Sequence, residues 1–274
     1  MGGGAMSGGV RVFSKEGTKM KMRLWGLVLL LALTPLMARA EGEKASAPAA
    51  DPRRVPFVGC EADGQAGPLN APQAARDELP LADAGGKLAY YQAQKGPGVL
   101  GPRGWKCYGW YGSNGAFVVV GPELEVLKTL GGPFGSPRIV AQAVDGDTSG
   151  KYEIAGAVAR VFPKYKSFVD KIVADDNIPA AYYVFEPYPA DSLHYLSDEA
   201  VEFETPAHSE GLASDAEDAY PTSGFVMLRT EKAEEDSAPQ IEGMDRLDIQ
   251  LPPKLQALSG KIREQFEQKY TPLP

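Results

Sequence analysis

Apolar residues change their spacing along this chain, and each change marks a segment with a different predicted structure. Between residues 55 and 137, short apolar runs such as Phe117–Val120 alternate with glycine and proline. Runs of this length between turn-forming residues are typical of strands joined by tight turns. A further run, Ile139–Val144, has the same character. The first ordered part of the chain is therefore predicted to be a Gly/Pro-rich β region.

The spacing then becomes helical. Ile154, Val158 and Val161 lie on one face of a predicted helix, with Ser149 placed to cap it and Pro163 to end it. Residues 164–174 carry four apolar positions at similar spacing and predict a second helix.

Strand patterns return after these helices. Residues 182–185, 200–204 and 224–229 are strand-like, and Leu247, Ile249 and Leu251 alternate with polar residues as in a half-buried strand. The last segment places Leu255, Leu258, Ile262 and Phe266 on one helical stripe. The sequence thus predicts an α+β fold: a β region stapled by one disulfide, two central helices, further strands and a C-terminal amphipathic helix.

The N-terminus has the pattern of an export signal. Lys21 and Arg23 precede the apolar run Leu24–Leu33, and small residues occupy positions 38 and 40. The run is too short for a membrane span, which needs about 20 apolar residues. Residues 1–40 are therefore predicted to be an N-terminal extension with a cleavable signal peptide, followed by a flexible leader (41–54) and one α+β domain (55–274).

Charge narrows the range of partners. The full chain has 28 basic and 36 acidic residues, a net charge of −8. Residues 1–40 contain six of the basic residues and one of the acidic ones, so cleavage after Ala40 leaves 22 and 35, a net charge of −13. Such a surface repels nucleic acid. The mature protein is predicted to be soluble, neither to bind nucleic acid nor to span a membrane, and to reside in the periplasm or outside the cell.

Cys60 and Cys107 are the two cysteines of the chain. In an exported protein an even number of cysteines favours a disulfide, and two cysteines allow one intramolecular pairing. The alternative is a cysteine nucleophile with His194 or His208 as its base. The two hypotheses exclude each other, because a disulfide removes the thiolate.

Aromatic residues surround Cys107. If residues 105–111 are extended, Trp105, Cys107 and Tyr111 share one face, whereas Tyr108 and Trp110 share the other. Aromatic packing beside a disulfide explains the cluster as ordinary core. The functional alternative is that Tyr108 and Trp110 form an exposed platform on which a ligand stacks.

Other chemistry has weaker support. Residues 145–150 resemble the start of a calcium loop, but its twelfth position is Gly156, where a bidentate glutamate is needed. The two histidines lack zinc-site spacing, and the chain contains neither a phosphate-binding loop nor a dinucleotide fingerprint. We therefore expect no metal and no cofactor. Paired carboxylates remain open, since any acidic chain can supply them.

Several motifs resemble a family of exported bacterial proteins. They are VPFVGC (55–60), DGQ (63–65), GPGVL (96–100) with PRGW (102–105) and Cys107, YGS (111–113), DTSG (147–150), FETP (203–206) and SEGL (209–212). The resemblance spans nearly all of the chain after residue 55 and departs at Ala213–Ser214, where the family tends to have Gly-Thr. It implies an exported single unit and supplies no catalytic residue.

The function predicted from the sequence is a non-enzymatic envelope protein. It would bind a polysaccharide, a peptide or a partner protein. The alternative is a cell-envelope hydrolase that uses either a Cys–His pair or carboxylates.

Overall fold

The computed structural model describes residues 53–81, 86–123, 137–231 and 240–270. These belong to one compact unit, Pro48–Pro274. The predicted signal peptide lies outside the described residues, as does the predicted leader apart from its last two residues.

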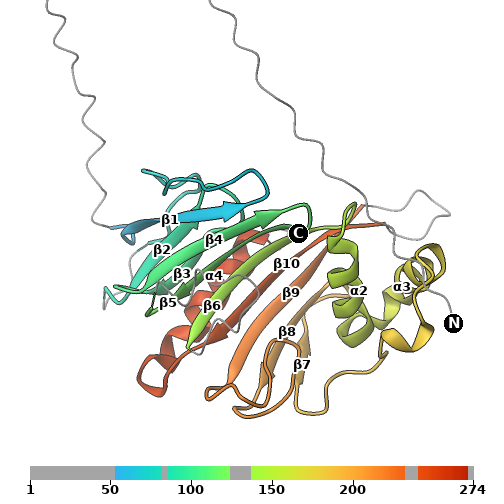
Figure 1. The fold of residues 1–274 in the computed structure, drawn as a ribbon. Coiled ribbons are helices and arrows are strands. Elements are labelled where there is room, and N and C mark those ends of the chain that lie inside the picture. The colour runs from blue at the N-terminus through green and yellow to red at the C-terminus, as the bar shows by residue number, and fades with distance from the viewer. Residues whose placement is uncertain (1–52, 82–85, 124–136, 232–239, 271–274) are drawn as a thin grey trace, which may run out of the picture. The chain divides into compact units, whose positions relative to one another are not determined.

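Ten strands form one mixed sheet in the order β3-β2-β1-β4-β5-β6-β10-β9-β8-β7 (Figure 1). Their bounds are β1 Phe57–Gly64, β2 Leu88–Ala93, β3 Val99–Pro102, β4 Lys106–Gly112, β5 Gly115–Gly121, β6 Arg138–Asp145, β7 Ser192–Tyr195, β8 Ala200–Thr205, β9 Thr222–Thr230 and β10 Ile241–Gln250. Strand β1 runs parallel to β2 and β4, and the other pairs are antiparallel.

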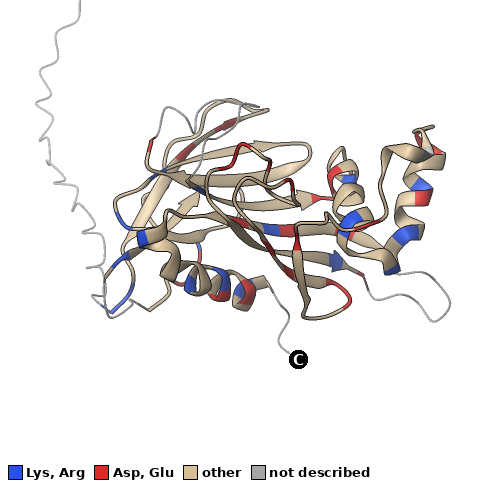
Figure 2. Cartoon of the chain, turned by 90° about the horizontal axis from the view of Figure 1, so that it is seen from below, with Lys and Arg blue, Asp and Glu red and all other residues tan. Residues whose placement is uncertain are grey.

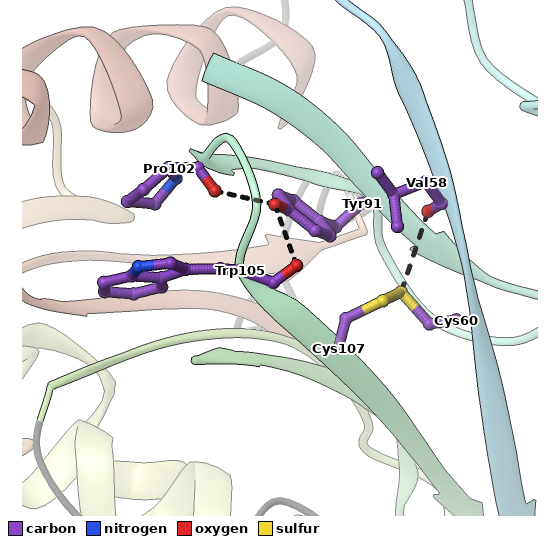
Figure 3. The surroundings of a disulfide bond; sticks show 6 residues. All are labelled: Val58, Cys60, Tyr91, Pro102, Trp105 and Cys107. Carbon is purple, nitrogen blue, oxygen red and sulfur yellow. Dashed lines mark hydrogen bonds between the residues drawn. A yellow bond between two sulfur atoms is a disulfide. The ribbon is translucent and has the colours of Figure 1, made fainter. Parts of the chain in front are cut away.

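The disulfide lies where β1 changes neighbours. Its first half, up to Cys60, pairs with β2, and its second half, from Glu61, pairs with β4. Cys60 and Cys107 are bonded across this junction, with their Cα atoms 5.3 Å apart. The predicted disulfide is therefore confirmed. Figure 3 shows Tyr91 beside it, whose hydroxyl donates hydrogen bonds to the carbonyls of Pro102 (2.7 Å) and Trp105 (3.3 Å).

Helices cover both faces of the sheet. They are α2 Gly150–Val161, α3 Lys166–Asp175 and α4 Ser259–Tyr270, with short 3₁₀ turns at Pro163–Tyr165, Ala180–Tyr182 and Pro253–Leu258. Helix α4 buries Ile262 and Phe266 against a core that includes Phe225 and Leu247. Helix α2 packs with α3 on the opposite face, where Val226 from the same strand as Phe225 joins its core. Strand β9 is thus buried on both sides, because its alternate residues enter different cores.

The predicted α+β architecture is wrong. The described chain is mostly one large mixed sheet of ten strands with three helices, two central and one C-terminal. The error arises in the first β region, where strands such as β2 are buried at every position and show no alternation. Strand β1 pairs in parallel with β2 and β4, and no crossover helix connects them among the described residues. The glycine-rich pattern gave no sign of this parallel pairing.

One predicted strand is absent. Tyr182 ends a 3₁₀ turn, and residues 183–185 follow it without pairing to a strand. Their apolar run does not reflect burial, since Tyr182 is 70% exposed, Val184 41% and Phe185 39%. Such exposure of large apolar side chains is unusual and bears on function.

Charged residues of both signs are mixed along α3 and α4, as Figure 2 shows. The described part of the chain contains no helix with the length and apolar content needed to cross a membrane.

Candidate functional site

Tyr108 and Trp110 point to the same sheet face from β4, and their rings meet edge to face with centroids 5.1 Å apart. Tyr108 is buried, with 8% of its surface exposed, whereas Trp110 is half-buried. Tyr108 therefore supports Trp110 from within the apolar cluster that they share with Val119, Phe117 and Val140.

Trp110 lines a hollow at the end of the β4–β5 hairpin. This tryptophan pocket has a volume of about 390 Å³ and is lined by Asp63, Gly64, Gln65, Trp110, Tyr111, Asn114, Gly115 and Phe117. Its aromatic side chains stand beside carboxylate and amide groups. Gly115 makes the sharp turn, since its φ of 116° and its approach to the Ala143 carbonyl leave no room for a side chain.

A second hollow, which we call the tyrosine groove, lies on the same face beside α2. Its volume is about 400 Å³, and it is lined by Tyr152, Glu153, Gly156, Ala157, Ala159, Arg160, Tyr182, Tyr183, Val184, Tyr188, Leu212 and Arg246. Four of its lining residues are tyrosines, whereas the tryptophan pocket has three aromatic residues.

The segment after α3 forms one wall of the groove by running back along α2. The guanidinium of Arg160 stacks 3.9 Å from the centroid of the Tyr188 ring and donates a hydrogen bond to the Glu186 carbonyl at 3.0 Å. Tyr183 is buried against the helix, and its ring meets that of Tyr182 edge to face. These contacts fix the segment while Tyr152 and Tyr182 stay 40% and 70% exposed at the rim.

Gly156 opens the floor of the groove. It lies inside α2, where glycine costs about 1 kcal/mol relative to alanine. A Cβ built there would meet nothing within 4 Å, so packing does not require a glycine. The residue instead leaves free the space that a side chain would fill.

A charged cluster forms the inner end of the groove. Arg246 is largely buried and donates hydrogen bonds to Asp248 (2.9 Å) and to the Leu212 carbonyl (2.6 Å). Glu153 extends toward the same place from α2. Burial raises the pKa of Glu153, a shift that Arg246 and a hydrogen bond from Gln142 partly offset. A carboxyl acceptor and a guanidinium donor are thus held side by side in a partly dehydrated site.

The opposite face of the sheet carries a carboxylate pair, Glu202 on β8 and Glu267 on α4. Glu202 accepts hydrogen bonds from Nδ1 of His194 (2.9 Å), and its other oxygen lies 3.1 Å from Nε of Arg263. Burial and the neighbouring Glu202 raise the pKa of Glu267 to about 7. Burial also disfavours the charge on Glu202, but His194 and Arg263 outweigh it and lower the Glu202 pKa. Protonation is therefore favoured at Glu267 and disfavoured at Glu202.

This pair predicts a pH-dependent stability. Because the folded protein holds the Glu267 proton more tightly than the unfolded chain, its free energy of unfolding should decline as pH rises from about 4.5 to 7. Glu267→Gln should remove that decline and stabilise the protein at pH 8 by roughly 1 kcal/mol, after allowance for solvent screening. Urea unfolding between pH 5 and 8 measures this, with Glu210→Gln as the control, because Glu210 is exposed and is not among the groups that shift the Glu267 pKa. Equal pH slopes in wild type and Glu267→Gln would contradict the raised pKa of Glu267.

The disulfide decides between the two hypotheses for the cysteines. Neither sulfur is a thiol, so the Cys–His hydrolase has no nucleophile. His194 lies on the edge strand β7, and His208 lies in a loop with a φ of 56°. No three His, Cys, Asp or Glu side chains among the described residues are placed to hold a metal ion. The hydroxyl of Ser149, the predicted helix cap, makes no capping hydrogen bond.

The sequence analysis identified Trp110 but none of the groove. Two features point to the groove in retrospect. One is the tyrosine-rich run after α3, which was interpreted as a strand, and the other is a glycine inside a predicted helix. Arg246 and Glu153 carry no sequence signal, because β10 and α2 meet only in the fold.

No protein-family model, curated protein or solved structure matches this chain. Its function is therefore inferred from the geometry of its own residues.

Proposed function

We propose that this protein is a non-enzymatic binding protein that holds a saccharide ring in the tyrosine groove. The observation that carries the proposal is the combination of exposed tyrosines, an open glycine floor and a charged inner end in one hollow. Small-molecule sites are typically hollows of this size that are lined by aromatic residues and a few convergent polar groups.

The groove suits the two kinds of surface on a sugar. The C–H faces of a sugar ring stack on aromatic side chains, and Tyr152 and Tyr182 offer exposed rings at the rim. Sugar hydroxyls donate and accept hydrogen bonds, which Glu153 and Arg246 match as acceptor and donor. The net charge of −8 disfavours polyanions, so the proposed ligand is a neutral saccharide.

An extracellular or periplasmic location belongs to the same proposal. Disulfides persist in oxidising compartments, and the buried Cys60–Cys107 bond is compatible with export. A neutral envelope glycan is then the ligand that this location would supply.

Filling the groove should abolish binding without damaging the fold. Gly156→Leu places a side chain in the open floor and also improves helix propensity, so its stability should equal or exceed that of wild type. The ligands to test are three neutral oligosaccharides: β-1,4-linked N-acetylglucosamine, β-1,4-glucan and mannan. For each one that binds wild type, we expect the affinity of the variant to be at least tenfold lower. Isothermal titration calorimetry measures this affinity.

Gly260→Leu is the matched control. Gly260 is also a helical glycine with nothing within 4 Å of a built Cβ, but it lies on α4, outside the groove. It should leave the affinity unchanged. The proposal fails if wild type binds none of the oligosaccharides, or if Gly156→Leu binds as well as Gly260→Leu.

A further inference from the structure

The tyrosine groove and the tryptophan pocket are joined by one row of residues across the sheet. Trp110 on β4 pairs with Phe117 on β5, Phe117 with Gln142 on β6, and Gln142 with Arg246 on β10. Directly opposed residues point to the same side of a sheet, so these four side chains lie on one face. Trp110 and Phe117 line the tryptophan pocket, and Arg246 lines the groove.

The row has a defined length. Neighbouring strands lie about 4.8 Å apart, so three steps place the Trp110 and Arg246 backbones about 14 Å from each other. Gln142, the residue between the two hollows, is half-buried and hydrogen-bonds Glu153 at the inner end of the groove. Gln142 therefore lies in the row between the charged cluster and the aromatic pair Trp110–Phe117.

We infer that this face binds an extended oligosaccharide, with one ring in the tyrosine groove and later rings lying along the row to Trp110. The inference rests on the proposed function and adds to it a second subsite and a polymeric ligand. Each end of the row combines flat aromatic groups with carboxylate or amide side chains: Trp110 with Asp63 and Asn114 at one end, and the tyrosines with Glu153 at the other.

The chemistry of the row favours a sugar chain over a peptide. An extended peptide gains its affinity mainly by pairing its backbone with an exposed sheet edge. Here β4, β5, β6 and β10 are interior strands, each paired on both sides, so their backbone groups are already used. Only side chains face the ligand, and side-chain carboxylates, amides and aromatic rings suit hydroxyl groups and ring faces.

The test is a series of oligosaccharides that differ only in length. The probes are oligomers of one to six sugar rings, built from the neutral saccharide that binds wild type. Calorimetry measures the affinity for each length. Wild type should gain at least tenfold in affinity between the shortest ligand that binds and the longest. Trp110→Ala should keep the short-ligand affinity within twofold and lose most of that gain.

Tryptophan emission gives an independent readout. Long ligands should shift the emission of wild type, and Trp110→Phe should abolish the shift while retaining Trp105, which precedes β4 and packs against the core on the opposite side of the sheet. Short ligands should leave the emission of both proteins unchanged. Because Phe keeps an aromatic ring, this variant remains informative if Trp110→Ala does not fold.

The outcomes separate the two proposals. If Gly156→Leu abolishes binding but affinity does not depend on ligand length, the groove binds a single ring and the extended site is wrong. If Gly156→Leu has no effect, the groove itself is wrong. If the length-dependent gain survives Trp110→Ala, the longer oligosaccharide does not lie along this row and the extended site is wrong. Preferential binding of an extended peptide at Trp110 would overturn the saccharide assignment.

Discussion

Loss of the Cys60–Cys107 bond is expected to lower the free energy of unfolding by about 4 kcal/mol. The two residues are 47 positions apart, and closing a loop of that length restricts the unfolded chain by about this amount in the chain-entropy model. The bond also joins β1 and β4 at the point where β1 leaves β2, so the reduced protein should lose pairing first at this junction.

Urea unfolding of the Cys60→Ala/Cys107→Ala double variant measures the effect. Reduction of the wild type with a thiol reagent is the matched control, because it breaks the bond without changing the side-chain volume of either residue. Both should shift the unfolding midpoint in the same direction, and the reagent should not affect the double variant. A double variant as stable as the oxidised protein would show that the bond contributes little.

Much of the local structure was predictable because it depends on local spacing. The helices built around Ile154, Val158 and Ile262 have one apolar stripe that faces one core, and their positions agree with the pattern. Alternation also marked the strand that contains Leu247 and Ile249. In each case the apolar positions of the pattern are buried, whatever covers the other side of the element.

The architecture was not predictable in the same way. Strand β2 is buried at all six positions and β9 at six of nine, so neither shows the period of two that identifies a half-buried strand. The order of strands in the sheet depends on pairings between residues far apart in the sequence. The parallel pairing of β1 with both β2 and β4 is the clearest example.

The same contrast between local sequence signals and long-range packing applies to the candidate site. Trp110 was found because tryptophan beside a cysteine is conspicuous in a sequence, but the burial of its neighbour Tyr108 depends on strands that pack in three dimensions. Arg246 and Asp248 alternate with Leu247 and Ile249 and read as solvent-facing residues. They are instead 14% and 15% exposed, because α2 and the loop at Leu212 cover that side of β10.

Asp245 is a charged residue buried on the other face of β10, in phase with Leu247 and Ile249, and it makes a strong prediction about stability. Its side chain is 1% exposed and lies 2.8 Å from Nη1 of Arg229, whose Nη2 donates a hydrogen bond to the Val144 carbonyl. Burial raises the pKa of Asp245, and Arg229 opposes that shift. Arg229 is therefore the main group that favours the ionised form of this buried carboxyl.

Arg229→Met should destabilise the protein by about 3 to 5 kcal/mol at pH 7, because it leaves that charge buried without its partner. Loss of Arg229 should raise the pKa of Asp245 further in the folded variant. Asp245 then binds a proton in the folded state at a higher pH than it does in the unfolded chain. The difference in free energy of unfolding between wild type and the variant should therefore become smaller as pH falls from 7 toward 4.

Two comparisons isolate the effect of the buried charge in urea unfolding. Lys171→Met breaks an exposed ion pair with Asp175, whose side chains are 74% and 57% exposed, and should cost less than about 1 kcal/mol. Arg229→Met/Asp245→Leu removes both charges and should recover most of the stability that the single variant loses. If the single variant is no less stable than Lys171→Met at pH 7, or if the double variant recovers nothing, then Arg229 acts through its packing and its bond to Val144, and the charge on Asp245 does not depend on it.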